Sequence, residues 1–365
     1  MLTKYIATPF VKGRYIRLQE VEKMIELLPK SLFFIREIGQ SVQGKSLYKI
    51  QFGAGKTRVI LWSQMHGNEG TTTKGLMDWL YALLHDVNYY RFISENYSIC
   101  ILPMVNPDGA NMHTRVNASN IDLNRDAKII SQPESQLLRK AIEDFQPDFA
   151  LNLHDQRTIF GVGESDTPST MAFLAPAFNE ERTINGVRQK AMAVIVAIYE
   201  QLSKQIGQRI ARFDDGFNDN CIGDYLTLKS IPTILFEAGH YPNDYQRELT
   251  RVCVFQSIVY AFAYMYNLED LSDDIVEKYR MIPNNLKTFN DIKIEGYSYC
   301  EPSLLKNGHL MIQFVEQLKA EQIDFVPTID RDETNHSMHA HLTIMAKNYS
   351  FFNENDVYQF LKQTL

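Results

Sequence analysis

Four short apolar runs constrain the fold of this chain more than any other feature of its sequence. They are rich in β-branched and bulky residues, are bounded by polar turns, and span residues 58–63, 99–104, 149–153 and 231–236. Runs of this kind indicate buried strands. Segments with helical spacing lie between them, the clearest from Val187 to Ile206. This alternation predicts an α/β fold with a mixed, mostly parallel sheet flanked by helices.

The pattern changes after Asn267, where an acidic segment is followed by several strand-like runs. These runs cover residues 292–299, 310–315, 323–329 and 341–345, and a helix is expected over 353–362. We therefore expect two domains, a catalytic domain over residues 1–268 and a small β-rich domain over residues 269–365.

Charge and cysteine content exclude several classes of function. The 365 residues carry a formal net charge of −7, which argues against a nucleic-acid partner because such proteins need a basic surface. The four cysteines are widely spaced and predict neither a disulfide framework nor a cysteine-based zinc site. The sequence also shows no secretion signal and no apolar stretch long enough for a membrane span, so we expect a cytoplasmic location and no membrane partner.

Polar residues follow each of the four predicted strands. His66 and Glu69 come after the first strand, residues 106–109 after the second, His154 after the third, and Glu237 closes the fourth. In open α/β sheets, ligands bind outside the carboxyl ends of the strands. We therefore expect these residues to gather in one crevice.

Three of these residues form a candidate metal site. His66 and Glu69 are three residues apart in a turn that contains glycine, and His154 can supply a third ligand. Two histidines and one glutamate are a known ligand set of catalytic zinc, which keeps a fourth position open. The H-x-x-E pattern alone usually marks two solvated side chains, but its place after a strand strengthens the prediction. Glu237 is a candidate general base, although an isolated glutamate there could equally form a cap or an ion pair.

Residues 115–126 contain two arginines, Arg115 and Arg125, with Asp122 and Asn124 between them. The planar guanidinium group suits a carboxylate or a developing oxyanion. Composition alone favours a solvated loop with local Asx turns.

Taken together, the chain resembles bacterial members of the zinc carboxypeptidase family, typified by carboxypeptidase A, over roughly residues 15–265. The resemblance rests on an ordered set of motifs: His66-x-x-Glu69, Asn106-Pro107-Asp108-Gly109, Arg115, Asp122-Leu123-Asn124-Arg125, His154 and Glu237. The order and spacing of the whole set are far more specific than any single motif.

The resemblance implies a zinc metallocarboxypeptidase. One Zn²⁺ per chain would be bound by His66, Glu69 and His154, and Glu237 would act as general base on a water that zinc activates. Arg115 would polarise the scissile carbonyl and stabilise its oxyanion. The implied reaction is hydrolysis of an amide bond next to a free C-terminal carboxylate.

The resemblance also implies that Asn124 and Arg125 bind the terminal carboxylate of the substrate. Two departures from the family pattern leave the substrate preference open. Asp126 follows Arg125 where the family commonly has asparagine, and residues 212–218 lack the tyrosine that many peptide-cutting members carry before the catalytic glutamate. Tyr225 is nearer in sequence, but the pattern does not assign it that role.

Two other functions remain open at this stage. The first is a zinc deacylase of small N-acyl amino acids, similar to aspartoacylase or succinylglutamate desuccinylase. The second is a catalytically silent protein that binds peptide C-termini. The expected partner is in each case a peptide or small acyl amino acid with a free carboxylate.

Four further histidines need an interpretation. His336, His339 and His341 lie close together in sequence and are more typical of a loop that leads into a half-exposed strand than of a second metal site. His240 follows Glu237 by three residues. We expect it to contact the metal-binding residues without binding the metal itself, or to lie on the substrate side.

Overall fold

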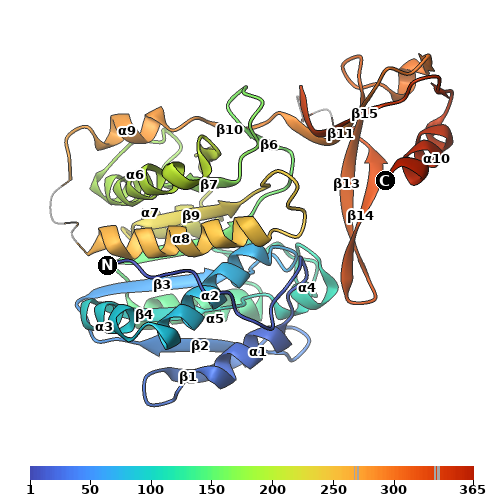
Figure 1. Cartoon of the computed structure of the whole chain (residues 1–365). Coiled ribbons are helices and arrows are strands. Elements are labelled where there is room, and N and C mark those ends of the chain that lie inside the picture. The colour runs from blue at the N-terminus through green and yellow to red at the C-terminus, as the bar shows by residue number, and fades with distance from the viewer. Residues whose placement is uncertain (267, 269–270, 333, 335–337) are drawn as a thin grey trace.

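The computed structural model describes residues 1–266, 268, 271–332, 334 and 338–365. Its largest sheet contains eight strands: β1 (Phe34–Gln40), β2 (Ser46–Phe52), β3 (Thr57–Ser63), β4 (Tyr97–Leu102), β5 (Phe149–Asp155), β7 (Met171–Leu174), β8 (Ile210–Arg212) and β9 (Thr233–Ala238). They are arranged in the order β1-β2-β4-β3-β5-β9-β7-β8 (Figure 1).

Four parallel strands form the centre of this sheet. β3 pairs in parallel with β4 and β5, and β5 pairs in parallel with β9. The outer pairs β1/β2, β2/β4 and β7/β9 are antiparallel, so the sheet is mixed, as predicted. The central strands are the four apolar runs of the sequence, with ends that differ by at most two residues. Their carboxyl ends lie along one edge of the sheet, which is where the candidate site residues follow them.

The central strands are buried on both faces, which explains why their sequences are apolar without alternation. Val59 and Leu61 of β3 belong to one core, whereas Ile60 and Trp62 belong to another. The first core includes residues of α1 (Leu18–Leu27), α2 (Thr71–His85), α3 (Val87–Asn96), α4 (Pro107–Met112), α6 (Gly186–Ile206), α8 (Glu248–Met265) and α9 (Ile275–Met281). The second includes residues of α5 (Pro133–Phe145) and α7 (Ile222–Leu228).

The C-terminal part is β-rich, as predicted, and has its own apolar core. Its four-stranded sheet has the order β14-β13-β11-β15 and is made of β11 (Phe289–Glu295), β13 (Leu310–Lys319), β14 (Gln322–Ile329) and β15 (His339–Met345). The strand expected over 292–299 ends before Gly296, whose φ of 71° breaks the extended backbone. The remaining elements are β12 (Tyr299–Cys300), β16 (Ser350–Phe351) and α10 (Glu354–Thr364).

The division at residues 268 and 269 stays a prediction, and residues 267, 269 and 270 lie outside the described residues. Two short strands connect the two parts, because β10 (Asn285–Lys287) pairs antiparallel with β6 (Phe160–Val162). The hairpin of β13 and β14 lies beside the end of the large sheet (Figure 1).

Several strands outside the centre of the large sheet could not be predicted from apolar runs. β1 is mostly exposed, so its sequence carries no continuous apolar signal. β7 and β8 are buried but contain only four and three residues, which is too short for a period to be recognised. Within the described part of the chain, no helix is both long and apolar enough to cross a membrane.

Two histidines meet where the loop after β9 contacts the C-terminal sheet. The rings of His240 and His341 lie 4.1 Å apart between centroids, and His341 Nε2 lies 2.8 Å from the carbonyl oxygen of Thr158. Burial and the charge of Arg247 lower the pKa of His341 to about 4. The hydrogen bond to Thr158 and the charge of Asp166 act in the opposite direction but do not outweigh them. Burial, His341 and Arg247 all lower the pKa of His240.

This pair predicts that the protein loses stability in mild acid. The unfolded chain, with histidine pKa values near 6.5, binds more protons than the folded chain between pH 6.5 and about 4. For His341 alone, the free energy of unfolding should therefore fall by on the order of 2 kcal/mol from pH 7 to pH 5, and His240 should add to this loss. Chemical denaturation at both pH values measures this change. A His341→Phe variant should lose less stability than the wild type over the same interval, and an equal loss in both proteins would contradict the assignment.

Candidate active site

Strand ends bring the predicted site residues together, as expected. His66 and Glu69 lie in the turn between β3 and α2, His154 lies near the end of β5, and Glu237 lies near the end of β9. His154 and Glu237 are direct neighbours in the register of the parallel pair β5/β9. Adjacent parallel strands therefore place a predicted metal ligand and the predicted base side by side.

The turn that carries His66 depends on a close approach of two backbones. A Cβ atom on Gly67 would lie 1.9 Å from the carbonyl carbon of Gly109, so only glycine fits at this position. Asn106 fixes the facing turn, because its side-chain oxygen accepts a hydrogen bond of 2.8 Å from the N–H of Gly109. The Asn106–Gly109 motif thus supports the metal-site turn from the next strand.

His66, Glu69 and His154 form a compact and buried triad. His66 Nδ1 lies 2.8 Å from Glu69 Oε1, and His154 Nδ1 lies 2.8 Å from Glu69 Oε2. The two Nδ1 atoms are 3.1 Å apart. Within the described residues this is the one group of three or more His, Cys, Asp or Glu side chains gathered closely enough to hold a metal ion.

The donor set of this triad fits zinc. Two imidazole nitrogens and a carboxylate converge with all three ligand atoms within 4.8 Å of one another. Three protein ligands of this type, next to an open cleft, match the arrangement of catalytic zinc sites. His66 also has the outer partner typical of zinc-binding histidines, because its Nε2 lies 3.0 Å from Asp122 Oδ1.

The charged groups of the site shift one another's pKa values. Burial alone would raise the pKa of Glu69, but His66 and His154 outweigh it and hold that pKa well below its ordinary value. Burial raises the pKa of Glu237 well above its ordinary value, and the negative charges of Glu69 and Asp155 raise it further. A cation between these carboxylates would favour the ionised form of Glu237.

Arg115 faces the triad from the loop after α4. Its Nη1 lies 3.2 Å from Glu69 Oε1 and its Nε lies 3.1 Å from Asp122 Oδ2. Burial would raise the pKa of Asp122, but the hydrogen bond from His66 and the charge of Arg115 lower it overall. About half of the Arg115 side chain is exposed, so its guanidinium group can also reach a substrate in the cleft.

Asn124 and Arg125 lie in a short 3₁₀ helix that Asp122 begins, since Asp122 Oδ1 accepts a hydrogen bond of 2.9 Å from the N–H of Asn124. Arg125 Nη1 lies 2.9 Å from the carbonyl oxygen of Asn124 and 2.7 Å from Cys221 Sγ. Neither partner is a carboxylate, so the guanidinium charge remains available to an anionic ligand.

These side chains surround one cleft of about 740 Å³, a size typical of small-molecule sites. Six of the seven predicted site residues line it: His66, Glu69, Arg115, Asn124, Arg125 and Glu237. His154 lies behind the lining and reaches the triad through Nδ1. Asp224 also lines the cleft, and burial raises its pKa to about 6.

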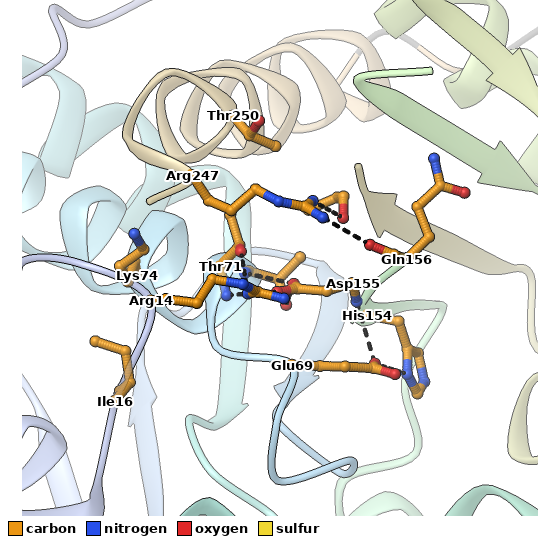
Figure 2. Close-up of polar contacts among 12 residues, drawn as sticks. Arg14, Ile16, Glu69, Thr71, Lys74, His154, Asp155, Gln156, Arg247 and Thr250 are labelled. Atoms are coloured by element: carbon orange, nitrogen blue, oxygen red, sulfur yellow. Dashed lines mark hydrogen bonds and ion pairs between the residues drawn. The ribbon is translucent and has the colours of Figure 1, made fainter. Parts of the chain in front are cut away.

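A network of polar contacts next to the triad holds in place the segments that carry the predicted metal ligands (Figure 2). Asp155 accepts N–H hydrogen bonds from Thr71 at 2.7 Å and Thr72 at 3.0 Å, and its own N–H donates to Glu69 Oε2 at 3.1 Å. Arg14 donates to the same Asp155 carboxylate at 3.0 Å. Arg247 joins the ends of β5 and β9, because it donates to the carbonyl oxygens of Gln156 and Ala238.

Two residues that the sequence singled out lie away from the cleft lining. Asp126 is buried and accepts hydrogen bonds from the backbone of Ser131 and Gln132, so its side chain fixes a turn. Tyr225 is stacked under Arg139, with 3.9 Å between the guanidinium carbon and the ring centroid.

His240, His339 and His341, which the sequence also singled out, lie away from the cleft lining. His240 is buried against His341 and Tyr245. His339 and His341 are half-buried in β15, and their Nε2 atoms lie near the carbonyl oxygens of Glu164 and Thr158. His336 lies outside the described residues.

Sequence reasoning missed Arg14, Tyr245 and three residues of the β13–β14 hairpin, Phe314, Glu316 and Phe325, all of which line the cleft. Arg14 and Tyr245 stand in no recognisable motif, and the three hairpin residues lie in or directly after predicted C-terminal strands whose position relative to the site the sequence does not predict. The one signal that could have pointed to Tyr245 is its position eight residues after Glu237, in the same loop.

Comparisons with known proteins agree with this geometry. Residues 21–160 match the family model described as zinc carboxypeptidase. A probable carboxypeptidase 2 of Trichophyton verrucosum is 27% identical over 192 residues, which are 50% of this chain and 34% of the relative. The chain thus spans about a third of the length of this curated relative.

Solved structures of low sequence identity share the fold. A metallo-carboxypeptidase from Burkholderia cenocepacia has a TM-score of 0.53 and 17% identity, over 69% of this chain and 70% of that one. Carboxypeptidase A from Helicoverpa armigera has a TM-score of 0.53 and 18% identity, over 70% of this chain and 74% of that one. The sequence match over residues 21–160, the shared fold and the arrangement of the site agree: the chain is similar to zinc carboxypeptidases in sequence over that segment and in fold.

Proposed function

We propose that this protein is a zinc metallocarboxypeptidase, a hydrolase that cleaves the amide bond next to a free C-terminal carboxylate. One observation carries the proposal. The cleft that contains the zinc-type triad also contains a carboxylate beside it, Glu237, and a guanidinium group, Arg125, that has no carboxylate in direct contact among the described residues. A metal, a base and an anion-binding group are the parts that this reaction needs.

His66, Glu69 and His154 would hold the zinc ion, which supplies Lewis-acid activation of the carbonyl and of the attacking water. Glu237 would accept a proton from the attacking water at its carboxylate oxygen and pass it to the leaving amine. Arg115 would turn toward the oxyanion that develops on the scissile carbonyl. Each of these side chains lines the cleft or reaches it from directly behind.

Asn124 and Arg125 would bind the terminal carboxylate. Arg125 can present two parallel N–H donors to a carboxylate, a geometry that fixes both position and orientation. This contact would place the scissile bond at a fixed distance from the triad, and the enzyme would then remove residues only from the free end.

A substrate panel with a chelator control tests the proposal. Zinc-loaded protein should hydrolyse peptides with a free C-terminus, and a chelator should stop the reaction until zinc is restored. Amidated versions of the same peptides should be poor substrates. Hydrolysis of N-acyl amino acids alone would favour the deacylase, and peptide binding without hydrolysis of any substrate would favour the silent binding protein.

Arg125→Ala should raise KM more than it lowers kcat. Loss of a charged hydrogen bond to the carboxylate is expected to cost about 1.5–3 kcal/mol, or roughly a 10- to 150-fold loss in kcat/KM. Steady-state kinetics on one peptide with free and amidated termini measures the effect. The variant should hydrolyse the amidated peptide as slowly as the wild type does. If activity on the free peptide is unchanged, Arg125 does not bind the carboxylate.

A further inference from the structure

The β13–β14 hairpin forms one wall of the substrate cleft. Gln313, Phe314, Val315, Glu316 and Phe325 line the cleft together with residues of the large sheet. The hairpin, residues 310–329, lies outside the segment 21–160 that matches the family model. Its contribution to the cleft is therefore a property of this chain's own C-terminal part.

Contacts of three residues fix the hairpin along its length. Gln313 Nε2 donates a hydrogen bond of 2.8 Å to Thr158 Oγ1, which lies just beyond the end of β5. Glu316 accepts from Arg14 at 3.1 Å and lies 2.8 Å from His113 Nε2. Near the tip, Glu321 forms an ion pair with Arg17.

The charges in these contacts favour a firmly held hairpin. Burial would raise the pKa of Glu316, but Arg14 and His113 lower it to about 2, so this carboxylate stays ionised at neutral pH. Three-quarters of the Glu316 side chain and nearly all of the Arg14 side chain are shielded from solvent. Arg14 of the N-terminal segment and His113, which follows α4, both contact Glu316 and thereby make the hairpin a fixed wall.

The surface that this wall presents is aromatic. Phe314 and Phe325 pack against Tyr245, each with 5.3 Å between ring centroids. Asp291 joins the group, because it accepts hydrogen bonds from the Tyr245 hydroxyl at 2.9 Å and from the N–H of Phe314 at 2.6 Å. All three aromatic side chains line the cleft and keep part of their surface exposed.

The wall and the proposed carboxylate-binding residues approach the triad from different sides. Asp122, which bonds the N–H of Asn124, contacts the triad through His66 Nε2. Asp155, which bonds Arg14, contacts it through Glu69 Oε2. Arg14 in turn bonds Glu316 of the hairpin. A substrate whose carboxylate lies at Arg125 and whose scissile bond lies at the triad would thus extend its acyl part toward the hairpin.

We propose that Phe314 and Phe325 determine specificity for the residue on the acyl side of the scissile bond, and that the preferred substrates are short peptides with an aromatic or large apolar residue there. This inference rests on the proposed function, since it assigns the acyl side from the proposed carboxylate contact. Aromatic rings bury large areas of apolar surface and prefer aromatic neighbours at an angle to their own plane, and Tyr245, Phe314 and Phe325 form a group of such rings.

Binding to the full-length, zinc-loaded Glu237→Gln protein tests this inference without requiring turnover. The probes are N-acetyl-Phe-X and N-acetyl-Gly-X, with the same C-terminal residue X, and the readout is Kd by calorimetry. The Phe peptide should bind about tenfold more tightly or better, the range expected for a fitted apolar pocket. Phe314→Ala, and separately Phe325→Ala, should remove most of that difference by weakening the Phe peptide alone.

The control is Gln317→Ala, an exposed position of β13 outside the cleft lining, which should keep the tenfold ratio. Zinc content and thermal unfolding verify that each variant is folded. Equal loss of affinity for both peptides, an unchanged ratio in both phenylalanine variants, or no binding of either peptide would overturn the inference. Peptide binding with the expected ratio, but no hydrolysis by the wild type, would overturn the proposed function alone.

Discussion

Replacing His66 with alanine is expected to remove both the zinc and the hydrolytic activity. The variant loses one of three proposed ligands. It also removes the imidazole whose Nε2 lies 3.0 Å from Asp122 Oδ1 in the wild type. Changes to the outer partners of zinc ligands already cost about 10- to 100-fold in affinity, so loss of a ligand should cost more than ~100-fold. Metal analysis of the purified protein should show zinc falling from about one per chain to a small fraction of that.

Two further variants make this experiment specific. Asp122→Asn keeps all three ligands but weakens the outer hydrogen bond, so it should lose affinity by the smaller factor of about 10- to 100-fold in a competition titration with a chelator. His85→Ala changes an exposed histidine at the end of α2 and should bind zinc as the wild type does. Full zinc content in the His66 variant would show that the ligand assignment is wrong.

Three of the site residues that the sequence predicted share one property. His66, His154 and Glu237 each follow an apolar strand, so the rule for strand ends was enough to bring them together. Local motifs then identified Glu69, Arg115, Asn124 and Arg125. Glycine is needed at the same strand ends, because the backbones of Gly67 and Gly109 approach closely where two neighbouring strands end.

The parts that could not be predicted depend on contacts between distant segments. Arg14 and Glu316 are separated by 302 residues, and neither belongs to a motif that points to the site. Phe314 and Phe325 were predicted only as strand residues, since a sequence pattern indicates which residues form a strand but not what that strand faces. The cleft wall therefore became visible only when the C-terminal sheet was placed beside the large one.

The second large effect is expected for Glu237→Gln, which should lower kcat by about 10²- to 10⁴-fold while zinc stays bound. Glutamine keeps the size and position of the side chain but accepts no proton at neutral pH. None of the three triad residues is changed, so zinc binding should be unaffected. Steady-state kinetics together with metal analysis separates the loss of the base from the loss of the metal.

Stability provides an independent check on the same variant. In the metal-free protein, burial and the charges of Glu69 and Asp155 disfavour an ionised Glu237. A neutral glutamine removes this repulsion, so the metal-free variant should be at least as stable as the metal-free wild type at pH 7. A variant that binds zinc fully, folds as stably as the wild type and yet keeps its kcat would show that Glu237 is not the base. A fall in kcat accompanied by loss of zinc would instead place Glu237 among the groups that hold the metal.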